Sequence, residues 1–241
     1  MLTGLCVSYG NARDSATCRV GLAQEVALTD GAIVPCERPL IGNSLYDLAS
    51  LTKLFTAICV LQMVEREQLR LDDNLGVRDD RFAALRQTSV YDVLTYQAVL
   101  RSPERIDAQP TPEDALRQVF LTGRFEGPEP ARLYSDMNAL VLRHLVERVS
   151  GLSYWDYLSR HIFAPCGMVE TYARVPRERL ADCLCYNYEH RLVNGQYRVI
   201  DDAQPGQPHD PKARLLAAVD GGPAGHAGLF STQSDMVRFA Q

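Results

Sequence analysis

The sequence is poor in lysine and has no basic patch. Lys and Arg together number 25, and only Lys53 and Lys212 among them are lysines. Asp and Glu number 30, so the net charge is -5, and the isoelectric point is near 5.6. Nucleic acids and anionic membrane surfaces attract proteins that cluster positive charge, so this balance argues against either partner.

No membrane span and no secretory signal are visible in the sequence. Its most apolar stretch, residues 48–64, is shorter than the roughly 20 residues of a spanning helix and carries Lys53 near its middle. Residues 1–6 show no basic region followed by an apolar run. The seven cysteines are odd in number and irregular in spacing, which is typical of free thiols in a reducing compartment. These features predict a cytoplasmic protein, unless the start of the chain has been removed.

Strand-like segments come first in the chain, and helix-like segments follow. Segments at 3–9, 17–28 and 32–34, separated by polar or Asp-Gly turns, predict an antiparallel sheet. Pro35 and Pro39 predict an irregular stretch after the third strand. Apolar spacing and N-cap residues then predict helices at about 48–64, 89–100, 111–120, 137–150, 153–163 and 234–241.

The second half of the chain is less regular. Residues 171–219 are typical of loop, with a hairpin turn at Val193–Gln196 and a break at His209–Pro211. With 46% hydrophobic residues, the chain can form one large core or two lobes. We therefore expect an α+β fold, in which a partial antiparallel sheet accompanies a helical lobe at about 68–170.

The stretch 48–64 combines a candidate nucleophile with a candidate base. It is apolar on nearly every side of a helix, which is typical of a buried helix, yet it contains Lys53. Lys can lose its proton when desolvated, whereas Arg effectively cannot. Ser50 precedes Lys53 by three residues on the same helical face and is the nucleophile that such a base activates. The alternative is a chance spacing, in which Lys53 extends to solvent along its own stem.

Ser50-x-x-Lys53 and the later Tyr134-Ser135-Asp136 resemble the first two motifs of the serine β-lactamase and penicillin-binding-protein-like superfamily. The chain resembles the class C side, which comprises class C β-lactamases, D-alanyl-D-alanine carboxypeptidases and related esterases. This resemblance implies an α+β fold of the β-lactamase/transpeptidase type. It covers nearly the whole chain and rests on the stretches Tyr46–Lys53, Tyr134–Asn138, Ile162–Met168 and Gly225–Thr232.

The resemblance implies acyl transfer through a covalent acyl-enzyme. Ser50 would attack a carbonyl carbon, Lys53 would take or relay its proton, and Tyr134 would shuttle a proton to the leaving group. The backbone N–H of Ser50, at a helix N-terminus, can donate to the developing oxyanion. Asp136 stands where many relatives carry Asn and is the candidate substrate-binding residue. For Tyr134, the alternative is a buried aromatic residue with a satisfied hydroxyl group.

The third motif of the family has no clear counterpart. His226-Ala227-Gly228 lacks its Ser or Thr and lies in a loop, whereas in relatives the motif lies on a later strand. The resemblance therefore implies a single domain, residues 1–241, that is incomplete at its C-terminus, with a sheet edge open to self-association. Two functions stay open. One is a serine hydrolase acting on a small ester, amide or β-lactam, and the other is a catalytically impaired remnant that serves as a non-catalytic or interaction module.

No cofactor or metal is predicted. Cys183, Cys185 and His190 do not have the spacing of a structural zinc site. The pair His209–Asp210 is too far from His226 in sequence to define a site. The expected partner is a small-molecule substrate.

Overall fold

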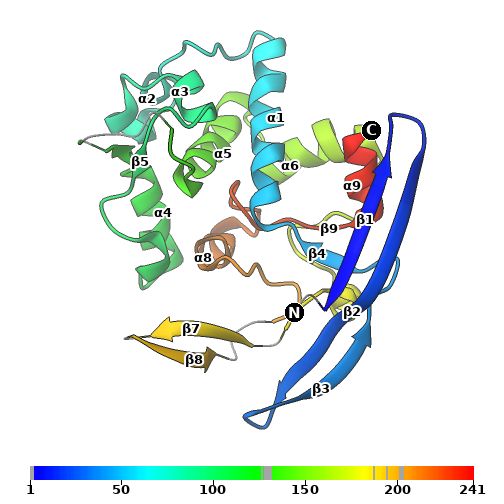
Figure 1. Ribbon diagram of the computed structural model, residues 1–241. Coiled ribbons are helices and arrows are strands. Elements are labelled where there is room, and N and C mark those ends of the chain that lie inside the picture. The colour runs from blue at the N-terminus through cyan, green and yellow to red at the C-terminus, as the bar shows by residue number, and fades with distance from the viewer. Residues whose placement is uncertain (1–2, 126, 128–131, 187, 194, 201–203) are drawn as a thin grey trace. The chain divides into compact units, whose positions relative to one another are not determined.

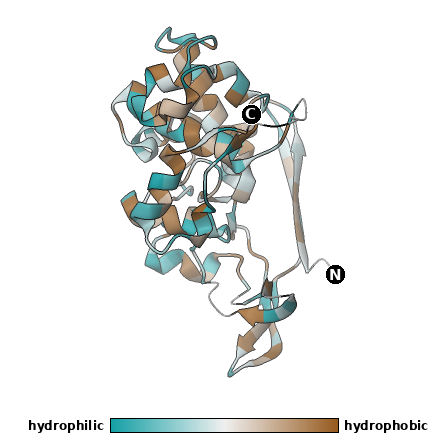
Figure 2. Ribbon diagram, turned by 90° about the vertical axis from the view of Figure 1, so that its left-hand side faces the viewer, coloured by the Kyte–Doolittle hydropathy of each residue, from teal (hydrophilic) through white to brown (hydrophobic). Residues whose placement is uncertain are grey.

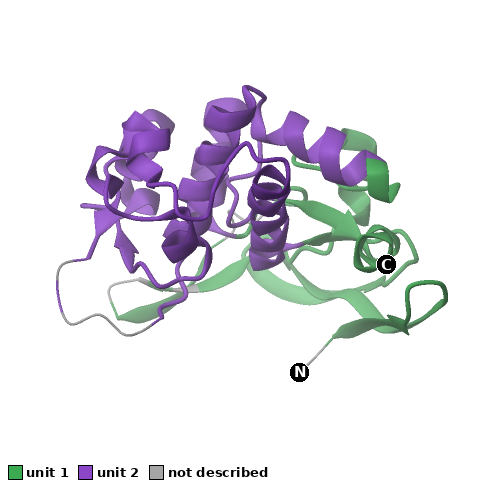
Figure 3. Ribbon diagram, turned by 90° about the horizontal axis from the view of Figure 1, so that it is seen from above, with its two compact units in different colours: residues 1–47, 165–209, 229–241 green, residues 48–164, 210–228 purple. Residues whose placement is uncertain are grey.

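The computed structural model describes residues 3–125, 127, 132–186, 188–193, 195–200 and 204–241. They form two compact units (Figure 3). The strand unit consists of Met1–Asp47, Pro165–His209 and Leu229–Gln241, and the helical unit consists of Leu48–Ala164 and Asp210–Gly228. The helical unit therefore includes the Ser-x-x-Lys segment and a late segment of the chain, both outside the predicted lobe of about 68–170.

A three-stranded antiparallel sheet is the main feature of the strand unit (Figure 1). In the order β1-β2-β3, its strands are β1 (Gly4–Gly10), β2 (Ser15–Thr29) and β3 (Ala32–Pro39). The turn after β2 places Asp30 and Gly31 at φ 50° and 79°, left-handed values that suit a tight hairpin. The prediction of an irregular stretch at the prolines is wrong. β3 passes Pro35 and ends at Pro39, because an edge strand tolerates residues that lack an N–H group.

One face of β1 is apolar and exposed. Leu5, Val7 and Tyr9 alternate along the strand with less exposed residues, and all three are solvent-exposed. Val20, the partner of Leu5 on β2, is exposed as well. Because β1 is an outer strand, one of its backbone edges has no strand partner in the described part of the chain.

The rest of the strand unit is built from short elements. They are β4 (Leu45–Asp47), which pairs with β9 (Phe230–Thr232), η5 (Arg177–Asp182), the paired strands β7 (Glu189–Val193) and β8 (Gln196–Ile200), and α9 (Gln233–Ala240). Asp235 of α9 is fully buried and accepts hydrogen bonds from the Glu170 N–H and the Thr171 hydroxyl at 2.6 and 2.9 Å. Asn194, in the predicted hairpin turn, lies outside the described residues.

The helical unit has an apolar core between three of its helices. Its elements are η1 (Ala49–Leu51), α1 (Thr52–Glu65), α2 (Leu75–Arg78), η2 (Asp80–Leu85), α3 (Val90–Leu94), β5 (Leu100–Arg101), η3 (Ile106–Ala108), α4 (Pro112–Phe120), β6 (Gly123–Arg124), α5 (Asp136–Ser150), α6 (Tyr154–Leu158), the π-helical η4 (Ser159–Phe163), α7 (Ala164–Cys166) and α8 (Pro211–Asp220). Phe55 and Met63 of α1, Leu140 and Leu145 of α5, and Leu158 of α6 are fully buried. Apolar and polar residues are interspersed along these helices, so each can turn an apolar face to the core (Figure 2).

α1 is not buried on every side, contrary to prediction. Leu54 and Leu61 are each 49% exposed, and the buried face carries the polar residues Lys53 and Thr56. The predicted start at residue 48 is also wrong, because the 3₁₀ turn η1 precedes α1 and Ser50 lies in that turn. A helix that is apolar all round has no polar side to mark its exposed face, so its neighbours decide which face is buried.

α8 was not predicted. Residues 171–219 were expected to be loop, yet a ten-residue helix runs from Pro211 to Asp220. The Asp210 side chain caps it by accepting from the Ala213 N–H at 2.9 Å, and Pro211 occupies the first turn. The expected break at His209–Pro211 is therefore a helix start, since proline suits the first helical position, where no N–H is needed.

The other predicted helix ends are largely confirmed. Thr111 caps α4, and Ser135 caps α5, which ends at Gly151 with φ 70°. The helix that begins after Ser89 is shorter than expected, because α3 ends at Leu94. In the described residues, every helix is too short or too polar to cross a membrane.

Candidate active site

Ser50 and Lys53 form the pair that the sequence predicted. Lys53 Nζ lies 2.9 Å from Ser50 Oγ, within hydrogen-bond distance. Lys53 is only 7% exposed, whereas Ser50, in the turn before α1, is exposed. A buried amine and an accessible hydroxyl are thus in direct contact at the start of a helix.

Two residues near this pair have a left-handed backbone conformation. Ala49, directly before Ser50, has a φ of 44°, and Tyr96 has a φ of 60°. Left-handed values cost residues other than glycine about 1 to 3 kcal/mol each and persist only where the surroundings hold them in place. The Ala49 conformation presents the Ser50 side chain at the start of α1.

Lys53 has two further acceptors besides Ser50. Its Nζ lies 3.1 Å from the His226 carbonyl oxygen and 2.8 Å from Asp136 Oδ1. An ammonium group can donate to all three oxygens at once. A neutral amine has two N–H bonds and one lone pair, so donation to His226 and Asp136 leaves the lone pair facing the Ser50 hydroxyl. The arrangement therefore suits Lys53 both before and after it takes a proton.

The His226 carbonyl is held in place from α1 itself. Thr56, one turn after Lys53, donates to the Gly225 carbonyl oxygen at 2.7 Å and hydrogen-bonds the Tyr154 hydroxyl at 2.6 Å. Gly225 has a φ of 87°, and a Cβ atom there would lie 2.7 Å from the Ala139 carbonyl oxygen. Only glycine fits this close approach of the loop to α5.

Asp136 lies between two lysines. It is the first residue of α5, and its Oδ1 and Oδ2 lie 2.8 and 3.1 Å from the Nζ atoms of Lys53 and Lys212. Burial by itself raises the pKa of Asp136, but the hydrogen bonds from Lys53 and Lys212 and the nearby charges of His226 and Lys53 bring the pKa below its ordinary value. Asp136 is thus an ionised carboxylate with both oxygens engaged, and its predicted role in substrate contact stays a prediction.

Sequence reasoning missed Asp210, Lys212 and His226 as members of one site. Asp210 lies 2.9 Å from His226 Nε2 and 3.4 Å from Lys212 Nζ. Burial raises the pKa of Asp210, yet the His226 hydrogen bond and charge and the Ala213 N–H outweigh it and lower the pKa. The available signals were the Asp-Pro helix start and the second of only two lysines in the chain.

Metal-ligating residue types meet at this point as well. One side-chain ligand atom from each of Asp136, Asp210 and His226 lies within 4.8 Å of the others. Lys53 and Lys212 already supply cationic partners to these carboxylates. Both carboxylates therefore already have side-chain nitrogen partners within the protein.

Tyr134 lies beside Lys53 but contacts it through its ring. Lys53 Nζ is 4.9 Å from the ring centroid, and the ring stacks on Tyr96 with centroids 5.6 Å apart. Tyr134 is 63% exposed, and in the described part of the chain its hydroxyl makes no hydrogen bond to Ser50 or Lys53. Burial is the main cause that raises the pKa of Tyr96 to about 12, and the nearby Tyr134 and Asp136 raise it further. Tyr96 therefore stays neutral.

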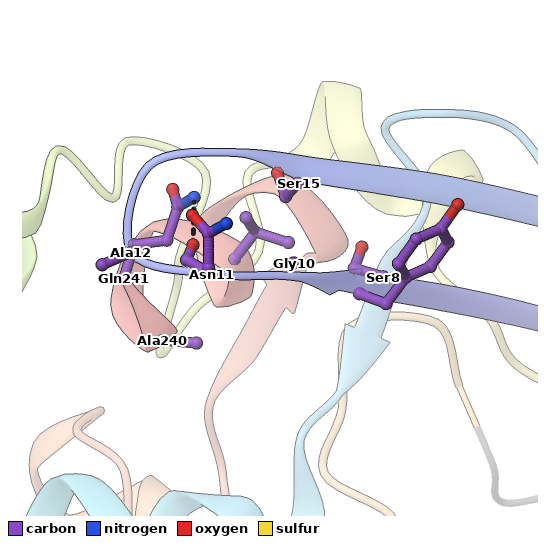
Figure 4. A pocket seen from close by; sticks show the side chains of 9 residues that line it. Ser8, Gly10, Asn11, Ala12, Ser15, Ala240 and Gln241 are labelled. Atoms are coloured by element: carbon purple, nitrogen blue, oxygen red, sulfur yellow. Dashed lines mark hydrogen bonds between the residues drawn. The ribbon is translucent and has the colours of Figure 1, made fainter.

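A separate hollow lies in the strand unit. It has a volume of about 520 Å³ and lies between the β1–β2 turn and the end of α9 (Figure 4). Gln241 donates to the Asn11 carbonyl oxygen at 3.1 Å across one side. No Asp, Glu, Lys, Arg or His is among its described lining residues. The nucleophile and base therefore lie in the helical unit, not in this hollow.

The fold places the chain in the β-lactamase/transpeptidase class of α+β proteins. It resembles the crystal structure of a class C beta-lactamase with a TM-score of 0.68 and 18% identity, over 98% of this chain and 58% of that one. It also resembles a beta-lactamase/D-alanine carboxypeptidase from Pseudomonas syringae, with a TM-score of 0.64 and 19% identity, over 99% and 59%. Both likenesses confirm the predicted fold.

The sequence profile of the Beta-lactamase family matches residues 23–241, so the chain belongs to this family of serine hydrolases. It is 29% identical over 222 residues to penicillin-binding protein 4* of Bacillus subtilis (strain 168). The alignment covers 85% of this chain and 46% of that protein. The chain thus spans about half the length of such relatives. The predicted family resemblance is confirmed.

Proposed function

We propose that this chain is a serine hydrolase that forms an acyl-enzyme on Ser50 with a small ester, amide or β-lactam substrate. The observation that carries the proposal is the 2.9 Å contact between Lys53 Nζ and Ser50 Oγ at the start of α1. His226 and Asp136 support it, because they orient the Lys53 amine. The exposure of Ser50 leaves its hydroxyl open to a substrate carbonyl.

The reaction proceeds in two steps. Ser50 Oγ forms a bond to the carbonyl carbon while its proton moves to Lys53 Nζ, and the Ser50 N–H donates to the oxyanion. The bond to the leaving group breaks, and the proton passes from Lys53 to the leaving atom, directly or through Tyr134. A water molecule then adds its oxygen to the carbonyl carbon, the bond between that carbon and Ser50 Oγ breaks, and a proton from the water returns to Ser50 Oγ. The free acid leaves.

The names of related proteins indicate which substrates to test first. One relative is named a penicillin-binding protein, and a similar structure is named a beta-lactamase/D-alanine carboxypeptidase. We therefore propose penicillins and peptides ending in D-alanine as the first substrates. The superfamily fold hosts several acyl-transfer reactions, so simple esters belong in the same panel.

The experiment is covalent labelling of the folded chain with a fluorophosphonate and a fluorescent penicillin, followed by peptide mass spectrometry. The expected result is one adduct on Ser50, which is lost in S50A. The exposed serine of α9, Ser234, provides the matched control, because S234A should label like the unchanged protein. A folded chain that forms no adduct on Ser50 with either probe would contradict the proposal.

The second candidate is a catalytically impaired remnant that serves as a non-catalytic or interaction module. The observation that favours it is the exposed Tyr134, whose ring rather than hydroxyl faces Lys53. A penicillin adduct that forms on Ser50 but is not hydrolysed would support this second candidate, because the chain would then acylate without turnover. The cytoplasmic location inferred from the cysteines stays a prediction.

A further inference from the structure

Lys212 shares the carboxylate of Asp136 with Lys53. Lys53 binds Oδ1 at 2.8 Å, and Lys212 binds Oδ2 at 3.1 Å. Lys212 comes from the first turn of α8, and its side chain is 23% exposed. Although the chain has 25 Lys and Arg, its two lysines meet on one carboxylate.

This geometry has a direct electrostatic consequence for Lys53. A lone carboxylate next to an amine favours the ammonium form, which cannot accept a proton from a serine hydroxyl. A second positive charge on the same carboxylate offsets this preference for the ammonium form. The Lys212 charge repels a proton on Lys53 and partly neutralises the negative charge of Asp136. Burial lowers the pKa of Lys212, but the Asp210 and Asp136 charges outweigh it and raise the pKa, so Lys212 stays charged.

The other groups around the pair are accounted for. Asp210 on α8 binds both Lys212 and His226, so its charge is divided between them. Asp107 on η3 also lies within electrostatic range of Lys212 and is paired with Arg105. Tyr134 and Tyr96 face Lys53 and Asp136 from the loops before α5 and after α3. The Asp136 carboxylate is the anionic side chain in direct contact with Lys53 in the described residues.

We propose that Lys212 is a positioning residue that sets, through Asp136, the pH at which Lys53 releases its proton. This inference extends the proposed function, because Lys53 must be neutral to activate Ser50. The known family motifs provide Ser50 and Lys53, while Lys212 comes from a helix that the motifs do not include.

Three variants test the charge argument. K212Q removes the second cation and should move the Lys53 titration midpoint upward by about one pH unit, which lowers the Ser50 labelling rate about tenfold below the midpoint. K212R keeps the charge and should stay within about 0.3 units of the unchanged protein. D136N/K212Q removes the carboxylate as well and should bring the midpoint back down.

Two readouts keep this inference separate from the proposed function. The first is the fluorophosphonate labelling rate of Ser50 measured from pH 5 to 10. The second is NMR of the chain labelled with ¹³C at lysine Cε, which contains two lysine signals that K212Q and K212R assign. The NMR titration follows Lys53 whether or not Ser50 reacts, so a chain without adduct refutes the acyl-enzyme and still tests the role of Lys212.

The outcomes are distinct. A midpoint that rises in K212Q, is kept in K212R and falls again in D136N/K212Q supports the proposal. A Lys53 midpoint that is equal in K212Q and the unchanged protein, or lower in K212Q, overturns it. A purely structural role for Lys212 would reduce the melting temperature in K212Q and leave the midpoint where it was.

Discussion

Replacing Thr56 by Val tests the link between the core of the helical unit and its site. Thr56 and Tyr154 are both fully buried, and their hydroxyls form a chain in which Tyr154 donates to Thr56 and Thr56 donates to the Gly225 carbonyl oxygen. Valine has nearly the same shape but no hydroxyl. T56V therefore leaves a buried donor on Tyr154 and a buried acceptor on Gly225 without partners.

The expected cost follows from those two groups. An unsatisfied buried polar group costs about 1 to 3 kcal/mol, so with two such groups T56V should lose about 2 to 6 kcal/mol of unfolding free energy. Y154F keeps the Thr56 bond to Gly225 and should lose only about 1 kcal/mol. T56V/Y154F removes both hydroxyls, so it should cost less than the sum of the two single variants.

Urea unfolding followed by Trp155 fluorescence is the assay. Trp155 is the only tryptophan of the chain and lies next to Tyr154 on α6, so its signal reports on the helical unit. T56S restores the hydroxyl and serves as the matched control. A T56V chain within about 0.5 kcal/mol of the unchanged protein, or strictly additive variants, would refute the reasoning.

Two other predictions concern acid stability and association. Burial raises the pKa of Glu147, but the His144 hydrogen bond and the Arg143 charge lower it to about 2, from an ordinary value of 4.5. The ionised carboxylate therefore stabilises the fold fully above pH 4.5, and this stability is lost as the pH falls through 4.5 toward 2; urea unfolding at pH 6 and pH 3 should show a loss of about 2 kcal/mol, and E147Q should show much less of it. We also propose self-association through the free edge of β1, so V7K should lower the apparent mass in analytical ultracentrifugation, whereas I33K on β3 should leave it unchanged; a monomeric parent chain would contradict this proposal.

Local signals were enough to predict much of the fold. Thr111 followed by proline and acidic residues gave the start of α4, and the apolar spacing that begins at Met137 and stops at Gly151 gave α5 to within one residue at its start. The same kind of signal, Asp210 followed by Pro211, was missed because the surrounding residues lack a clear apolar period. The buried face of α1 could not be read from the sequence, because an apolar helix offers no contrast between its sides.

The residues of the candidate site also divide into those that local spacing predicts and those that it does not. Ser50 and Lys53 meet because three residues separate them at the start of a helix, so their contact is local. Lys212 and His226 reach Lys53 only through the late segment of the helical unit, 159 and 173 positions along the chain. Spacing along a sequence carries no information about such a contact unless the intervening fold is known.

The two prolines of β3 limit how far an assembly through the sheet can grow. β1 has a backbone N–H at every position from Gly4 to Gly10, whereas β3 has none at Pro35 and Pro39. An incoming strand can therefore form a regular ladder along β1 but not along β3. Two chains paired β1 to β1 about a twofold axis use the β1 edge of each chain, so pairing through this sheet would close as a dimer.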